Sequence, residues 1–250
     1  MKQSLSAIVI AKNEQERIDA CLTSLSWASE IIVVDNGSTD ETVSLATQHG
    51  ATVYTTKEKD FSGIRELGLH NASGQWVLYI DADEQVAESL RDEIKHTITS
   101  HREDDPIGYF IKRDTYYLGS HWPFRDKVER LFLRASLRGW HGILHETPLY
   151  VGTVGILANP LVHRTHRTLE DMVAKTNEWS RLEAKLRYDA HHPPVVWWRL
   201  LRVMITGFCR SFFAQGGWKA GTVGWIESIY QSFSMFITYA KLWELQQTKK

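Results

Sequence analysis

The first hundred residues alternate short apolar runs with amphipathic segments. Apolar runs rich in β-branched side chains predict buried strands at residues 5–11, 30–34, 51–55 and 76–80. Between these runs, apolar residues spaced three or four apart predict helices, one carrying Ile18, Cys21, Leu22 and Leu25 and two others at residues 62–72 and 86–99. Strands that alternate with helices indicate a parallel sheet with right-handed crossovers, so the predicted fold class is α/β.

The pattern changes after the charged turn at residues 102–106. Residues 107–118 and 128–134 alternate apolar and charged side chains, which predicts antiparallel strands that extend the sheet. A long helix is expected from Leu169 to Tyr188.

Carboxylates follow two of the predicted strands at the points where these strands end. The strand at residues 76–80 runs into Asp81-Ala82-Asp83, and the strand at residues 30–34 runs into Asp35-Asn36-Gly37. Ligands in open α/β sheets bind beyond the carboxyl ends of strands, and two close carboxylates repel unless a cation lies between them. The tripeptide alone fits an ordinary solvated turn equally well. Ser38 with Glu41 predicts a capping box at the next helix.

Composition and motifs narrow the class of protein. With 250 residues, 43% of them hydrophobic and 24% charged, the chain is long enough for one large α/β domain with an appendage. It contains neither a G-x-G-x-x-G turn nor a G-x-x-x-x-G-K-S/T loop, which argues against a dinucleotide enzyme and a P-loop NTPase. A bound diphosphate would therefore need another counter-charge, which Mg²⁺ or Mn²⁺ held by Asp81 and Asp83 could supply.

The C-terminal part is basic, whereas the body is acidic. Residues 1–160 hold 16 Lys/Arg against 23 Asp/Glu, a difference of −7, and residues 161–250 hold 13 against 7, a difference of +6. This asymmetry predicts a polyanionic partner for the second part. The two cysteines form no metal-ligand pattern and the N-terminus does not resemble a signal peptide, so we expect the protein in the cytoplasm.

The basic tail has an interfacial pattern at residues 195–213. At about 100° per residue, Arg199, Arg202, Thr206 and Arg210 fall on one side of a helix whose other side is apolar. Trp197 and Trp198 suit the level of lipid headgroups, so we expect the tail to bind the anionic inner face of the cytoplasmic membrane. A second apolar segment at residues 223–243 is expected to pack beside it. The alternative is an ordinary helix pair covering the sheet; nucleic acid is disfavoured because the aromatics alternate with aliphatic residues.

Five sequence motifs, taken in order, resemble those of a known family. They are Ala11-Lys12-Asn13-Glu14, Val33 to Asp40, Arg65 with Gly68, Asp81-Ala82-Asp83, and Gly142 to Glu146 followed by His163. Together they resemble the inverting family-two glycosyltransferases of GT-A fold, specifically lipopolysaccharide-core β-1,4-glucosyltransferases. We therefore expect a GT-A domain over residues 1–165 and a helical, membrane-associating extension over residues 166–250.

The resemblance implies a role for each matched residue. The nucleotide-sugar would be bound by Ala11, Asn13, Glu14, Asp35, Arg65, Asp81 and Ala82. Asp83 and His163 would hold Mg²⁺ or Mn²⁺, with His166 a weaker candidate. The alternative role for Arg65 is that of an ordinary surface arginine on its helix. The alternative role for Asp40 is only to stabilise the N-terminus of a helix.

Glu146 is the expected general base, because an attacking sugar hydroxyl must lose its proton. Trp140 and His145 would line the site and shield Glu146 from water. The alternative role for Glu146 is a salt bridge to a nearby arginine, and Asp126 and Asp114 are the reserve bases.

The expected reaction transfers a hexose, glucose from UDP-glucose, onto a lipid-linked core oligosaccharide with inversion at the anomeric carbon. Two alternatives remain: transfer onto a polyprenyl phosphate, or a non-catalytic glycan- or nucleotide-binding membrane protein. Asn36 and Glu66 occupy positions where the family more often has Asp and Asn, so the identity of the nucleotide stays open. The sequence also does not predict the donor sugar, the acceptor hydroxyl or the oligomeric state.

Overall fold

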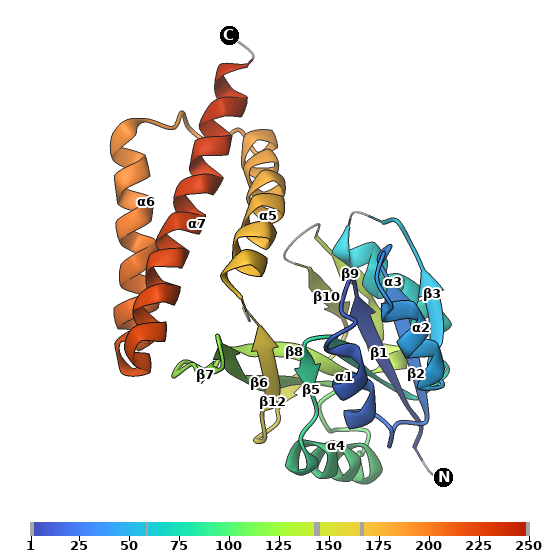
Figure 1. Ribbon diagram of the computed structural model, residues 1–250. Coiled ribbons are helices and arrows are strands. Elements are labelled where there is room, and N and C mark those ends of the chain that lie inside the picture. Colours follow the sequence, from blue (N-terminus) through green and yellow to red (C-terminus); the bar gives the residue numbers. More distant parts are fainter. Residues whose placement is uncertain (1–2, 59, 143–145, 166–167, 249–250) are drawn as a thin grey trace. The chain divides into compact units, whose positions relative to one another are not determined.

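The computed structural model describes residues 3–58, 60–142, 146–165 and 168–248. Internal contacts divide the chain into two compact units (Figure 1). The first comprises residues 1–114 and 126–163, and the second comprises residues 115–125 and 164–250. The expected domain boundary at residue 165 stays a prediction.

The first unit is built on the predicted parallel sheet. Its parallel strands lie in the order β3-β2-β1-β4, with the bounds Leu5–Ala11 for β1, Glu30–Asp35 for β2, Thr52–Thr55 for β3 and Trp76–Asp81 for β4. All four predicted strands are confirmed to within one residue. Because the strands are parallel, the ends of β1, β2 and β4 lie at one edge of the sheet.

Antiparallel strands extend the sheet beyond β4, as predicted. β8 (Lys127–Leu133) pairs with β4, and β6 (Gly108–Tyr117) pairs with β8. Four shorter strands join them in the described part of the chain, namely β5 (Glu84–Gln85), β7 (Ser120–His121), β11 (Val154–Ile156) and β12 (Leu161–Thr165). A separate two-stranded sheet consists of β9 (Leu137–His141) and β10 (Thr147–Tyr150).

Helices cover the sheet because successive residues of a strand face opposite sides. On β1, Ala7 and Val9 belong to one core, whereas Ile8 and Ile10 belong to the other. The first core takes its helical residues from α1 (Ile18–Ser24), α2 (Thr42–Gln48) and α4 (Glu88–Ser100), and the second takes them from α3 (Phe61–Asn71). Strands buried on both faces explain the continuous apolar runs of the sequence.

The predicted capping box at Ser38 and Glu41 is wrong. Helix α2 begins at Thr42, and its N-cap residue Glu41 makes no side-chain capping hydrogen bond. Ser38 instead accepts a hydrogen bond from the Asn13 amide, and the Asp40 carboxylate accepts one from the Thr42 amide. The Ser38 hydroxyl therefore bonds to the loop after β1, whereas the local sequence pattern predicted that it would cap the helix.

The second unit contains the helices α5 (Leu169–Asp189), α6 (Trp197–Cys209) and α7 (Gly221–Gln247). The predicted helix at residues 169–188 is confirmed, and the two apolar tail segments are helices that pack side by side (Figure 1). Their shared core contains Ala184, Val195, Val203, Tyr239 and Leu242. No helix in the described part of the chain has the length and apolar character needed to cross a bilayer.

Candidate active site

The loops that follow β1 and β2 hold each other at the carboxyl edge of the sheet. The Asn13 amide donates to Ser38 Oγ over 2.8 Å, and Asn13 Oδ1 accepts from the Thr39 amide over 2.8 Å. Asp35 is fully buried, and its carboxylate accepts from the amides of Gly37 and Ser38 at 3.1 and 3.2 Å. Asn13 and Asp35 thus lie in one interlocked loop pair.

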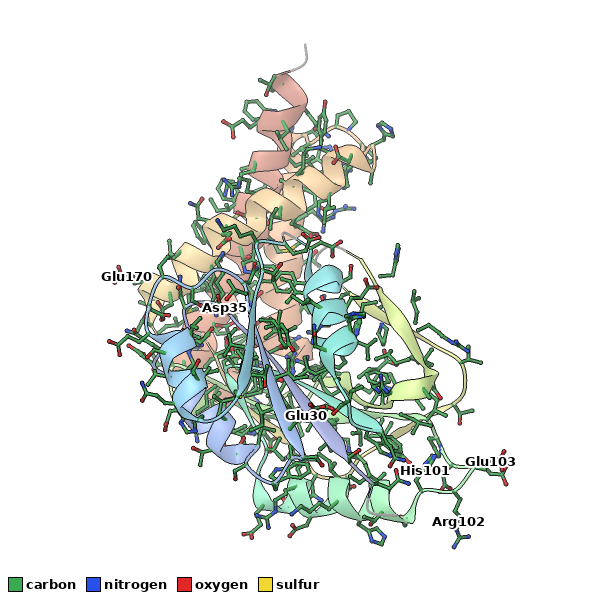
Figure 2. All side chains as sticks on the ribbon, turned by 90° about the vertical axis from the view of Figure 1, so that its right-hand side faces the viewer. Glu30, Asp35, His101, Arg102, Glu103 and Glu170 are labelled. Atoms are coloured by element: carbon green, nitrogen blue, oxygen red, sulfur yellow. The ribbon has the colours of Figure 1, made fainter. Side chains whose placement is uncertain are left out.

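Glu30 and Asp35 lie at the two ends of β2 (Figure 2), and their carboxylates have different roles. Glu30, at the amino end, accepts hydrogen bonds from the Ser6 hydroxyl and from the Ser73 amide and hydroxyl. Partial burial acts to raise the pKa of Glu30, but these hydrogen bonds outweigh it and lower the pKa. Glu30 therefore ties strands and turns together, whereas Asp35 lies at the edge where ligands bind in such sheets.

Ala11 and Ala82, both predicted to bind the nucleotide-sugar, lie at the end of β1 and directly after β4, and they join neighbouring strands through backbone hydrogen bonds. The Ala11 carbonyl accepts from the Asn36 amide, and the Ala82 amide donates to the Ile10 carbonyl, at 2.9 and 3.1 Å. Both alanines are buried at the carboxyl edge of the sheet.

Arg65 lies at the centre of the charged side chains. It is only 5% exposed, so its alternative role as a surface arginine is wrong. Its Nε and Nη2 approach Glu146 Oε1 at 2.7 and 2.6 Å, and Nη2 lies 3.4 Å from Asp81 Oδ1. Its guanidinium also packs over the rings of Trp140 and Tyr79, at 4.9 and 5.5 Å from the centroids. The structure thus brings three predicted site residues together, and shows the arginine bridge considered for Glu146.

The position of Arg65 depends on the close approach of α3 to the sheet. Gly68, one turn further along α3, packs directly against β1, and a Cβ there would overlap Ile8 Cγ2. The third guanidinium nitrogen of Arg65, Nη1, is buried and has no hydrogen-bond partner within the described residues. Nη1 of Arg65 is therefore a candidate contact for a ligand oxygen.

A second buried arginine, Arg130 on β8, also pairs with Asp81. Arg130 is 3% exposed, and its Nη2 contacts both Asp81 Oδ2 and Glu84 Oε1, the latter at 2.9 Å. Glu84 is fully buried and lies 3.4 Å from Arg113 Nη1. Burial acts to raise the pKa of Asp81, but the charges of Arg130 and then Arg65 outweigh it and hold that pKa well below its usual range. Asp81 is therefore ionised at neutral pH.

Sequence reasoning missed Glu84, Arg113 and Arg130. For Arg130, the only hint in the sequence was its position directly before the apolar run from Leu131 to Leu133. Alternation along one strand indicates which side chains share a face, but it does not identify the neighbouring strand.

Asp83 and His163 come together although 80 positions separate them in the sequence. His163 Nε2 lies 3.4 Å from Asp83 Oδ2, and Arg17 Nη1 lies 3.7 Å from the same oxygen. Arg17 Nε in turn pairs with Glu14 Oε2 at 2.8 Å. The predicted metal-binding pair is thus adjacent, and Glu14 is linked to it through Arg17.

The donor set fits a cation that shares its ligands with a substrate. The described residues contain no cluster of three His, Cys, Asp or Glu side chains able to hold a metal ion. Mg²⁺ is commonly bound by one or two carboxylates together with substrate phosphates, and Mn²⁺ accepts an imidazole as well. Asp83 and His163 are such a partial set. His166, the weaker candidate, lies outside the described residues.

The reserve base Asp126 is, like Glu146, paired with an arginine. Asp126 pairs with Arg113, whose Nε lies 3.1 Å from Asp126 Oδ1. Partial burial acts to raise the pKa of Asp126, but Arg113 outweighs it and lowers the pKa, which weakens this carboxylate as a base. Asp114 is half-buried on β6, and His145 lies outside the described residues.

Comparison with known proteins shows the family of the chain. Residues 6–157 match the family model described as glycosyl transferase family 2, so the chain belongs to that family. It is 31% identical to an uncharacterized glycosyltransferase of Rickettsia prowazekii (strain Madrid E), covering 97% of this chain and 88% of the relative. It is 28% identical to the lipopolysaccharide core biosynthesis glycosyltransferase LpsC of Rhizobium meliloti (strain 1021), covering 99% and 95%.

A solved structure supports the fold. TarS of S. aureus, residues 1–349 in complex with UDP-GlcNAc, superposes with a TM-score of 0.50 at 14% identity, covering 99% of this chain and 92% of that chain. The predicted GT-A fold with a C-terminal helical region is confirmed.

Proposed function

We propose that this glycosyltransferase moves a hexose, glucose from UDP-glucose, onto a lipid-linked core oligosaccharide of the bacterial envelope. The observation that carries the proposal is the pairing of Arg65 with Glu146 and Asp81, beside Asp83 and His163, at the carboxyl edge of the sheet. The likeness to LpsC supports the acceptor class. Such an acceptor places the enzyme in the cytoplasm, on the inner face of the cytoplasmic membrane.

The donor would occupy the edge formed by the loops after β1, β2 and β4. The Asp35 carboxylate would accept a hydrogen bond from the uracil or ribose, and the Asn13 loop would border the same subsite. Asp81 would face the ribose. The planar fork of Arg65 suits diphosphate oxygens, and its Nη1, which has no hydrogen-bond partner among the described residues, would give the diphosphate a first contact.

Donor binding and base release would be linked through Arg65. In the structure, Arg65 holds the Glu146 carboxylate through two nitrogens. A diphosphate carries more negative charge than a carboxylate and would compete for the same guanidinium. The carboxylate of Glu146 would then be available to the acceptor hydroxyl.

The reaction is a direct displacement. The acceptor hydroxyl oxygen attacks the anomeric carbon, its proton passes to Glu146, and the bond from the anomeric carbon to the diphosphate oxygen breaks as UDP leaves. Attack from the side opposite the leaving group inverts the anomeric centre, so an α-linked donor gives a β-linked product. Asp83 and His163 would hold Mg²⁺ or Mn²⁺, whose charge stabilises a departing diphosphate.

A thermal-shift screen tests the donor and the metal together. UDP-glucose, UDP-GlcNAc and a GDP-sugar are each added with and without Mn²⁺, because a ligand of the native state stabilises it by about 2.7 kcal/mol at one hundred times its Kd. We expect UDP-sugars to raise the melting temperature and Mn²⁺ to increase that shift. Asp83→Asn should remove the Mn²⁺ increment, whereas Asp92→Asn, on the exposed face of α4, should retain it. An unchanged increment in Asp83→Asn would contradict the metal site.

A further inference from the structure

Helices α6 and α7 expose a row of large apolar side chains that the glycosyltransferase site does not use. On α6, Trp197, Leu201 and Ile205 follow one another at four-residue intervals and are 73%, 51% and 63% exposed. On α7, Trp225, Ile229 and Phe233 repeat the same spacing and are also exposed. Side chains four residues apart lie on one face of a helix, so each helix presents one apolar stripe.

Aromatic contacts join the C-terminal end of α6 and the turn after it to Trp225 of the α7 stripe. Phe208 of α6 lies 5.8 Å from Trp225 of α7 between ring centroids, and Phe212 lies 4.3 Å from the same indole. Phe213, 63% exposed, packs edge-on against Phe212 at 5.1 Å. Gly207 allows the close approach of the helices, because a Cβ there would lie 3.1 Å from Met235 Cγ. The stripes therefore form one surface, here called the α6–α7 face.

The charge from the residues before α6 to the first turn of α7 has a single sign. Residues 190–226 contain four Arg/Lys and no Asp/Glu, and the exposed Glu244 lies further along α7. Arg199 and Arg202 both lie over the Trp198 ring, at 5.3 and 5.6 Å from its centroid, and Lys219 lies 5.2 Å from the Trp218 centroid. The cations are thus held beside the exposed indoles. Glu227, the first acid of α7, is buried and adds no negative charge to the surface.

Helix α5 of the same unit provides a contrast. It also exposes apolar side chains, including Val173 at 53%, but residues 169–189 carry five Asp/Glu with four Lys/Arg. Mixed charge of this kind does not select an anionic partner. The α6–α7 face combines apolar stripes and exposed tryptophans with a segment, residues 190–226, whose charges are all basic.

We propose that the α6–α7 face is a membrane-docking surface that lies in the headgroup region of an anionic lipid bilayer. The indoles of Trp197, Trp198 and Trp218 occupy the interface, Leu201 and Ile205 reach the acyl boundary, and the basic side chains meet lipid phosphates. The helices lie on the membrane and do not cross it. This inference rests on the surface itself and does not require the proposed sugar transfer.

Vesicle flotation with the full chain tests the surface. The probes are vesicles of zwitterionic phosphatidylcholine and vesicles of phosphatidylcholine mixed with anionic phosphatidylglycerol. We expect binding to the anionic vesicles, weaker binding to the neutral ones, and release at high salt, because exposed charges are screened. Equal binding to both vesicles would contradict the role of the basic flanks, and no binding to either would overturn the proposal.

Two pairs of variants locate the contact. Ile205→Asp should weaken vesicle binding about tenfold or more, whereas Val173→Asp on α5 should not change it. Arg202→Gln should weaken it about fivefold, whereas Arg181→Gln on α5 should not, since one basic residue near an anionic surface contributes ~1 kcal/mol. Equal effects within a pair would contradict the assignment. A dimer in light scattering that Ile205→Asp dissociates, without vesicle binding, would instead make this face an interface between two copies.

Discussion

Charged side chains are usually exposed and large apolar side chains usually buried, and each of the two units departs from this rule in its own way. In the first unit, guanidinium and carboxylate groups lie buried at the edge of the sheet, where Arg130 and Glu84 are 3% and 0% exposed. In the second unit, indoles and aliphatic side chains lie exposed beside basic residues on the α6–α7 face. Buried charge and exposed apolar surface both lower the stability of a folded chain unless a partner compensates them. The two departures therefore differ in what has to compensate them.

The compensation also differs between the two places. The charges at the edge of the sheet are compensated within the protein, because the half-buried Asp81 contacts two arginines and the buried Arg130 contacts two carboxylates. The exposed stripe on α6 has no such internal compensation. We therefore expect substitutions at the edge to act on the free energy of unfolding and on catalysis, and substitutions on the α6–α7 face to act on membrane binding.

The largest effect on stability is expected at Arg130. Arg130→Met leaves Glu84 buried without its closest cation and should lower the free energy of unfolding by about 3–5 kcal/mol, the usual cost of breaking a buried ion pair. The same substitution at the exposed Arg202 of α6 should change it by less than about 0.5 kcal/mol. Urea denaturation of both variants measures the difference. Equal losses would remove the distinction between the two regions.

A smaller loss is expected when a tryptophan of the buried edge is replaced. Trp140 Nε1 donates to the Tyr79 hydroxyl over 3.0 Å, and that hydroxyl donates to the Arg65 carbonyl over 3.2 Å. Trp140→Phe should cost about 1–3 kcal/mol, because Tyr79 loses a buried donor. Trp197→Phe, on the exposed stripe, should leave the unfolding midpoint unchanged. A larger effect at Trp197 than at Trp140 would show that the stripe is packed in solution.

A third effect depends on pH and concerns Asp81. Because its arginine partners depress the pKa of Asp81 in the folded state, the pairing stabilises the fold above the ordinary carboxyl pKa of about 4 and is lost as the pH falls toward the folded-state pKa. The stability difference between wild type and Asp81→Asn should therefore be largest near neutral pH and shrink below pH ~4. Denaturation at several pH values measures it, with Asp104→Asn in the exposed turn as the control. A difference that grows on acidification would contradict the pairing.

The sequence predicted the strands and helices well because their signals are local. The runs at β1, β2 and β4 are apolar on both faces, and the helices between them have regular spacing. Asp35 and Asp81 were found for the same reason, since each lies at the end of such a run. The resemblance to the family added Arg65, Glu146 and His163, which no local pattern singles out.

The contacts within the site were not predictable, because they join segments far apart in the chain. Arg130 meets Asp81 across the antiparallel pair of β8 and β4, and Glu146 meets Arg65 across 81 positions. The capping box failed for a related reason. Ser38 had the right spacing from Glu41, but its hydroxyl accepts a hydrogen bond from the amide of Asn13, in a loop 25 positions earlier in the chain.

The most direct test of the account is hexose transfer by wild type and Glu146→Gln. Radiolabelled UDP-glucose and membranes containing lipid-linked core oligosaccharide are incubated with each protein, with Glu103→Gln in an exposed turn as the matched control. If Glu146 takes the acceptor proton, Glu146→Gln should lose about 10²–10⁴-fold in kcat and still be stabilised by the donor, whereas Glu103→Gln should match wild type. Transfer by Glu146→Gln at the wild-type rate would contradict the account, and would favour a polyprenyl phosphate acceptor that needs no base.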